Sequence, residues 1–61
     1  MSNIDKQETM ISTNMMSISK NTDVIAKNVV DIETNSESIA SNSARIEQNS
    51  DKISANMMSI S

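Results

Sequence analysis

Residues 32–56 read IETNSESIASNSARIEQNSDKISAN, a stretch in which isoleucine returns every seven residues and asparagine follows each isoleucine by three. The same spacing continues outward to both ends of the 61-residue chain. Every isoleucine of the chain belongs to this column, which consists of Ile4, Ile11, Ile18, Ile25, Ile32, Ile39, Ile46, Ile53 and Ile60. The asparagine column consists of Asn14, Asn21, Asn28, Asn35, Asn42, Asn49 and Asn56, with Gln7 one repeat before it.

A strict seven-residue apolar repeat is typical of a helix that keeps one seam against a partner helix. Seven residues fall slightly short of two helical turns, so helices that share such a seam wrap around each other left-handedly. In heptad notation, isoleucine takes position a and asparagine takes position d. We therefore expect an all-α fold in which residues 1–61 form one coiled-coil segment, a single long helix of a longer fibre.

The composition predicts that the helix needs other chains to bury its apolar stripe. The chain has no glycine, no proline and no aromatic residue, so it lacks both turn formers and the bulky side chains of a compact core. An isolated helix of this polar composition would be marginal, and we expect the single chain to be largely unfolded until it associates. At its start, Ser2 or Asn3 is expected to cap the helix, with fraying over residues 1–3.

The asparagine column favours three strands. A buried amide group that lacks a partner costs about 1–3 kcal/mol, so these layers must be satisfied. Three amides that converge on the axis of a parallel trimer can surround a water or an anion with N–H donors. Apolar residues beside the seam, such as Met10, Met15, Val24 and Val29, also suit three or more helices. We expect a parallel left-handed trimer in which the amides set strand number and register.

Two other structures fit parts of the pattern. In a second register isoleucine would take position d, and the column that begins at Glu8 would take position a, which leaves the repeated asparagine at the edge of the seam. Asparagine ladders also occur in β-solenoids, but solenoid repeats need turn residues, and this chain has neither glycine nor proline.

Several functions are disfavoured by what the chain lacks. Without histidine and cysteine, the usual general base, the thiolate nucleophile and the commonest transition-metal ligands are missing, so we expect no enzyme, metal site or cofactor. The net charge of −3 is spread along the chain and predicts no nucleic-acid partner. No apolar run approaches the roughly 20 residues of a membrane span, so we expect no direct membrane contact.

The pairs Asn21-Thr22, Asn35-Ser36, Asn42-Ser43 and Asn49-Ser50, each preceded by Ile-x-x, resemble stalk repeats of trimeric autotransporter adhesins. These adhesins are fibrous bacterial surface proteins of type V secretion, and related repeats occur in phage tail fibres. The resemblance implies a homotrimer whose inward asparagines coordinate anions, typically chloride, on the axis. It assigns that role to Asn14, Asn21, Asn28, Asn35, Asn42, Asn49 and Asn56. The pattern departs where Met follows Asn14 and Asn56, and where Val follows Asn28.

The residues and the resemblance together predict a structural spacer. The resemblance implies that the chain is the stalk of an extracellular fibre at a bacterial outer membrane, which holds an adhesive head away from the cell surface. Its partner would be a further copy of itself. The alternative is an interaction helix that assembles with different chains, as SNARE or scaffold helices do.

Overall fold

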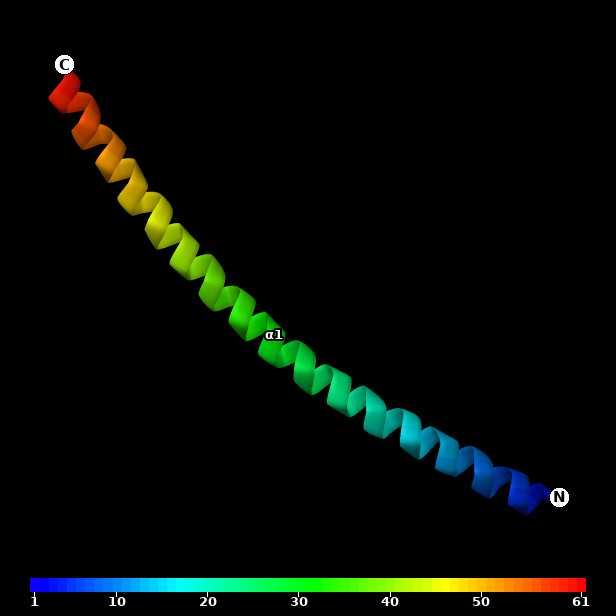
Figure 1. The fold of residues 1–61 in the computed structure, drawn as a ribbon. Helices are drawn as coiled ribbons and strands as arrows, with labels where there is room; N and C mark the ends of the chain where they lie inside the picture. The colour runs from blue at the N-terminus through cyan, green and yellow to red at the C-terminus, as the bar shows by residue number, and fades with distance from the viewer. The chain divides into compact units, whose positions relative to one another are not determined.

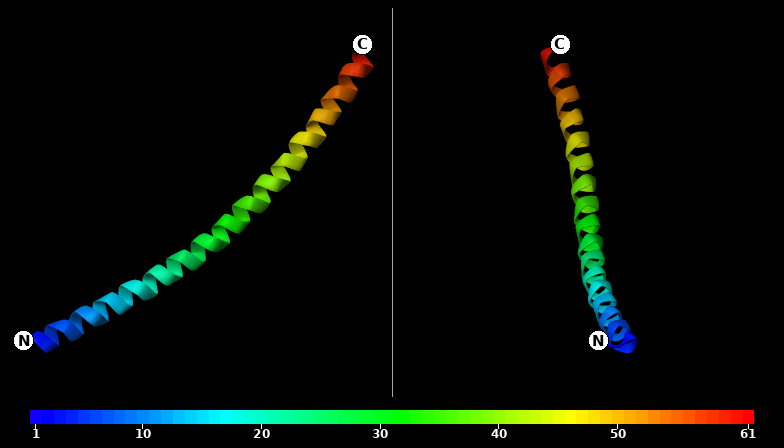
Figure 2. Two further views of the ribbon diagram at one scale, coloured as in Figure 1. Left: turned by 180° about the vertical axis from the view of Figure 1, so that it is seen from behind. Right: turned by 90° about the vertical axis from the view of Figure 1, so that its right-hand side faces the viewer.

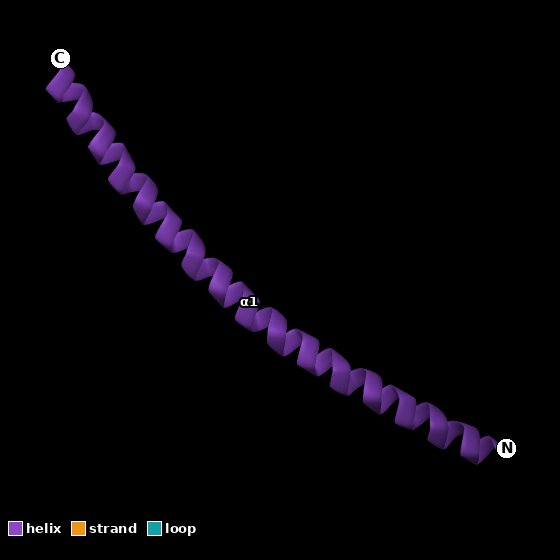
Figure 3. Cartoon of the chain, viewed as in Figure 1, coloured by secondary structure: helices purple, strands orange, loops and turns teal.

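The structure is a computed structural model that describes all of residues 1–61. It contains one element of secondary structure, the helix α1 (Asn3–Ile60, 58 residues), and no strand (Figure 1). Figures 2 and 3 likewise draw each half of the chain as helix. Met1, Ser2 and Ser61 lie outside α1. This confirms the expectation of an all-α chain built from a single long helix.

The continuity of α1 follows from the residues that the chain lacks. Proline would remove a backbone donor and clash with the preceding turn, and glycine would raise the entropic cost of the helix. Neither residue is present, and every backbone unit is trans with no positive φ. The chain divides into two halves, Met1–Asp31 and Ile32–Ser61, and α1 runs through both.

A reciprocal pair of hydrogen bonds caps the start of α1. The backbone N–H of Asp5 donates to the Ser2 hydroxyl at 3.1 Å, and the backbone N–H of Ser2 donates to Asp5 Oδ2 at 3.2 Å. This capping box satisfies two N–H groups that have no partner within the helix, and it places a carboxylate near the positive end of the helix dipole. Ser2 is therefore the cap, and Asn3, which we expected to fray, is the first helical residue.

In the first half, exposed side chains form hydrogen bonds and one ion pair with residues one turn away. The hydroxyls of Thr9 and Thr22 donate to carbonyl oxygens one turn earlier, at 3.0 and 2.9 Å. Lys27 Nζ lies 2.8 Å from Asp31 Oδ2, and both side chains are largely exposed. An exposed pair one turn apart stabilises a helix by only about 0.3–0.5 kcal/mol.

The second half is held almost entirely by backbone hydrogen bonds. It contains no ion pair, and its last turn has no basic residue to oppose the negative end of the helix dipole. At the end of α1 the Ser61 hydroxyl donates to the carbonyl oxygen of Met58 at 3.1 Å. The backbone N–H of Ser61 donates to the carbonyl oxygen of Met57, also at 3.1 Å.

No residue of the chain is buried. Every position is exposed to solvent, and α1 makes no long-range tertiary contact, so the chain by itself has no hydrophobic core. Most helical stability in proteins comes from packing of an apolar face and not from intrinsic helix propensity. The chain itself supplies no such packing for α1.

Candidate interaction surface

The isoleucine and asparagine columns lie side by side on α1. Each residue of an α-helix advances by about 100°, so residues seven apart differ by only about 20° from two full turns. An isoleucine and the asparagine three positions later lie about 60° apart around the axis. Within each half of the chain, the two columns therefore form one stripe. We call this stripe the Ile/Asn face.

The isoleucines of the Ile/Asn face are uncovered to nearly the same extent in every repeat. In the first half they expose between 58% and 67% of their surface. In the second half the range is 59–69%, apart from Ile60, which exposes 86% at the end of the helix. The surface that a partner helix could bury is thus repeated heptad after heptad.

The asparagines of the Ile/Asn face have no partner within the chain. None of the side-chain hydrogen bonds involves an asparagine of the column. Each amide keeps two N–H donors and a carbonyl acceptor available. Successive asparagines of the column are about 10 Å apart along the axis, so one chain cannot bring two of them to the same ion. Any anion site at these positions needs amides from other chains.

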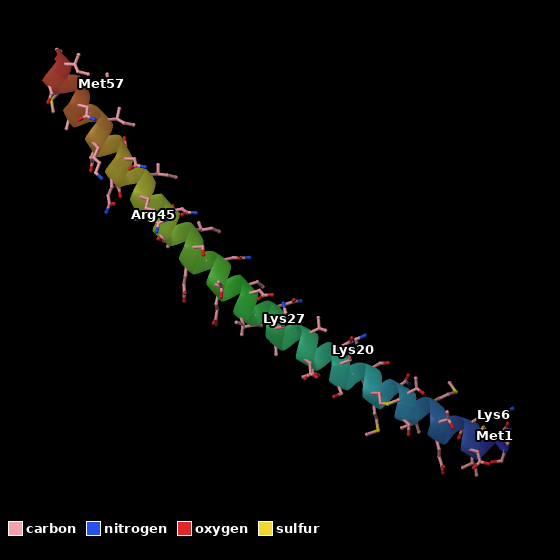
Figure 4. The ribbon with its side chains drawn as sticks, in the orientation of Figure 1. Met1, Lys6, Lys20, Lys27, Arg45 and Met57 are labelled. Carbon is pink, nitrogen blue, oxygen red and sulfur yellow. The ribbon has the colours of Figure 1, made fainter.

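Figure 4 shows side chains projecting from all sides of α1, with no second element of the chain facing any of them. Lys20 and Lys27 are labelled in the first half, and Arg45 and Met57 in the second. The basic residues are separated along the helix and do not form one patch. The Ile/Asn face therefore differs from the rest of the α1 surface in its seven-residue repeat, and not in its charge.

A second periodicity, of 14 residues, is superimposed on the heptad. Residues 3–16, 17–30, 31–44 and 45–58 align without gaps, and the second heptad of each unit carries the larger or less polar residues after its asparagine. These pairs are Met15-Met16, Val29-Val30, Ser43-Ala44 and Met57-Met58. The first heptad carries a polar pair at the same place, such as Thr22-Asp23 or Ser36-Glu37. Adjacent heptads therefore differ in the residues that follow asparagine, whereas every second heptad resembles the other in them.

The chain forms no pocket, and no three potential metal ligands among its acidic residues lie together. No part of α1 combines the length and the apolar character that a membrane-spanning helix has. The Ile/Asn face is the surface that repeats along α1, and its isoleucines are exposed in both halves.

Comparison with known proteins gave no significant match to any protein family, any curated protein or any solved structure. Function is therefore inferred from α1 itself. Its repeated Ile/Asn face is exposed in both halves and has free amides beside uncovered isoleucines. That combination is typical of a helix that assembles with other helices through mixed apolar and polar layers.

Proposed function

We propose that the chain is a structural spacer, a stalk segment that self-assembles through its Ile/Asn face into a parallel, left-handed trimeric coiled coil and has no catalytic role. The single observation that carries the proposal is the exposure of every isoleucine along one uninterrupted helix, with an asparagine at a constant offset. A stripe of this kind is stable in water only when other helices cover it.

The separation of the two residue types into two columns favours a parallel arrangement. In a parallel coiled coil each layer contains the same heptad position from every chain, so isoleucine meets isoleucine and asparagine meets asparagine. In an antiparallel arrangement position a packs in the same layer as position d of its partner. Every layer would then place an asparagine amide against an isoleucine. Because isoleucine forms no hydrogen bond, the buried amide would lack a partner, which costs about 1–3 kcal/mol.

The amide layers also favour three chains. Around a three-fold axis, three asparagines can turn their N–H groups toward one central water or anion, and their remaining polar atoms toward one another or solvent. Extra apolar residues beside the seam, at Met10, Met15, Val24 and Val29, widen the apolar face beyond what two strands need. Each amide layer reduces hydrophobic burial but restricts how the strands can combine.

The resemblance to trimeric autotransporter adhesins supports an extracellular setting at a bacterial surface. In this proposal the axial ligand is chloride or water, held by Asn14, Asn21, Asn28, Asn35, Asn42, Asn49 and Asn56. Polar layers would also keep single strands from collapsing strongly, so that they could cross a membrane unfolded and assemble outside. A helix that assembles with different partner chains would expose the same face. The mass of the isolated chain in solution distinguishes this interaction helix from the homotrimeric stalk.

Sedimentation equilibrium of the chain alone, combined with circular dichroism over a range of concentrations, tests the proposal. We expect helical signal that rises with concentration, and a mass of three chains. A partner-dependent helix would instead remain a single chain with little helical signal until a different protein is added. A mass of one or two chains across the concentration range would rule out the trimeric stalk.

Axial anions are tested separately by melting the assembly in chloride and in a poorly coordinating anion at equal ionic strength. A ligand that binds only the assembled state raises its stability according to its concentration and affinity, so chloride should raise the melting temperature. Equal melting temperatures in the two salts would remove chloride as a stabilising ligand and leave water in the amide layers. The strand number would be unaffected by that outcome.

A further inference from the structure

The Ile/Asn face leaves the register of the chains undecided. All nine a positions are isoleucine, and seven of the eight d positions are asparagine. If one chain slides by seven residues, isoleucine still meets isoleucine and asparagine still meets asparagine in almost every layer. The expectation that the amides set the register is therefore incomplete, because a uniform column excludes only slips that are not multiples of seven. Within the layers that still overlap, only residues beside the columns distinguish whole-heptad slips.

The residues that flank the columns carry that information. In a parallel coiled coil the residue at position g, just before each isoleucine, faces the e residue five positions later in the neighbouring chain. With the chains in register, four of the eight pairs join residues of similar size and polarity, and the other four, such as Lys52 with Met57, do not. The matched pairs are Met10 with Met15, Ser17 with Thr22, Val24 with Val29, and Ser38 with Ser43.

A slip of seven residues removes the apolar partners of Met10 and Val24, although Ser38 still faces a serine. On one side of the slipped chain Met10 would face Thr22 and Val24 would face Ser36, and on its other side Ser17 would face Met15. Apolar side chains would then pack against hydroxyl groups and lose burial against each other. A slip of 14 residues restores an apolar partner for Met10, but it places Val24 opposite Ser43 and shortens the overlap by two heptads.

We propose that Met10, Met15, Val24 and Val29 set the register, so that the partner of each chain is a second copy aligned in parallel with no offset. This inference rests on the proposed self-assembly and adds its register. The four side chains are uncovered in α1, with 64%, 64%, 48% and 51% of their surface exposed. All four lie in the first half, and the flanks of the second half are mostly serine.

Cross-linking between engineered cysteines tests the register, because the chain has no cysteine of its own. A Ser38→Cys chain labelled with ¹⁵N is mixed in turn with Ser36→Cys, Ser43→Cys or Ser50→Cys, then melted and cooled. A bismaleimide shorter than the roughly 10 Å rise of one heptad joins neighbouring thiols. Ser43 faces Ser38 in register, whereas Ser36 and Ser50 face it only after a slip of seven. All four substitutions are alike and leave the proposed register-setting residues intact.

We expect about tenfold more product of mixed isotopic mass from the Ser43→Cys mixture than from either other mixture. The variant Met10→Ser/Val24→Ser should bring the three yields within about threefold of one another. The control Met16→Ser/Val30→Ser removes the same residue types from position f of the same units, which faces away from the neighbouring chain, and should keep the tenfold preference. Met15→Ser/Val29→Ser removes the other member of each pair and should act as Met10→Ser/Val24→Ser does.

The outcomes separate this inference from the proposed function. A single-chain mass would overturn the self-assembly itself. A trimer that yields the three products equally, or that favours the Ser36→Cys or Ser50→Cys product, would leave the stalk intact and overturn the register rule. The rule would also be wrong if the Met16→Ser/Val30→Ser control lost the preference as completely as Met10→Ser/Val24→Ser. If neither flank variant assembles, the register rule is tested by the cross-linked yields of the Ser36→Cys, Ser43→Cys and Ser50→Cys mixtures in chains that keep all four flanking residues.

Discussion

Replacing Asn35 and Asn42 with isoleucine tests whether the asparagine column faces inward. Both residues lie in the second half, where the flanks are mostly serine and few other apolar contacts are available. In the proposed trimer the double substitution turns two amide layers into apolar layers. We expect the assembly to become more stable, and isoleucine at both a and d remains compatible with three strands.

The expected magnitude follows from the exposure of neighbouring isoleucines. Ile32 and Ile39 keep 65% and 66% of their surface exposed in α1. Full burial of such a side chain is worth about 1.5–3 kcal/mol, so about 1–2 kcal/mol remains to be gained at each new isoleucine. The amide interactions lost at the same site are worth about 0.5–1.5 kcal/mol. The central net gain is about 0.5 kcal/mol per site, or about 3 kcal/mol over the six sites of a trimer.

Thermal melting followed by circular dichroism measures this change. For an assembly of this size a gain of about 3 kcal/mol raises the melting temperature by about 6–12 °C. The matched control is Thr34→Ile/Ser41→Ile, which adds the same side chains one residue earlier, at position c on the outer surface. The control should change stability by no more than about 0.5 kcal/mol per site. The mass of each variant is checked by sedimentation equilibrium.

Two results would refute the inward placement of the asparagines. One is an unchanged or lower melting temperature for Asn35→Ile/Asn42→Ile while the assembly stays trimeric. The other is an equal rise for the Thr34→Ile/Ser41→Ile control, which would mean that any added isoleucine stabilises the helix irrespective of its face. The first result would favour the second register, with isoleucine at d and asparagine at the edge of the seam, whereas the second would leave the register undecided.

Two further substitutions test the local contacts of α1. Ser2→Ala removes the cap and should destabilise each helix by about 1 kcal/mol, seen as a lower melting temperature and faster amide exchange in the first turn. Ser12→Ala, inside the helix, should be neutral or slightly stabilising, and equal losses in the two variants would argue against a specific cap. Lys27→Ala breaks the ion pair with Asp31 and should cost no more than about 0.5 kcal/mol, a difference that salt reduces. Lys20→Ala is its control, because Lys20 forms no ion pair, and a large loss in either variant would contradict this picture.

Much of the candidate surface could be predicted because it depends only on helix geometry. Once the chain is helical, the seven-residue spacing places Ile32, Ile39 and Ile46 on one stripe, whatever the side-chain conformations are. Asn35 and Asn42 must lie beside that stripe for the same reason. The 14-residue alternation is equally a property of the sequence, although it becomes visible only when the flanks are compared over two heptads.

The hydrogen-bonded details could not be predicted in the same way. Both Ser2 and Asn3 are residue types that cap helices, and the choice between them depends on whether Asp5 can return a hydrogen bond to the capping residue. Lys27 forms an ion pair with Asp31 one turn later, which depends on long side chains with many rotamers of similar energy. The sequence spacing of Ser2 and Asp5, or of Lys27 and Asp31, permits these contacts. Whether each one forms depends on the local side-chain conformation.

The sequence by itself determined that the chain is helical, that isoleucine and asparagine share a face and that no catalytic site is expected, because these follow from periodicity and composition. The structure decided where the helix begins and ends, that Ser2 caps it, and that each half is helical. It also showed that nothing in the chain covers the Ile/Asn face. The physical reason is that a heptad specifies which side of a helix is apolar, whereas burial of that side depends on what lies opposite in space.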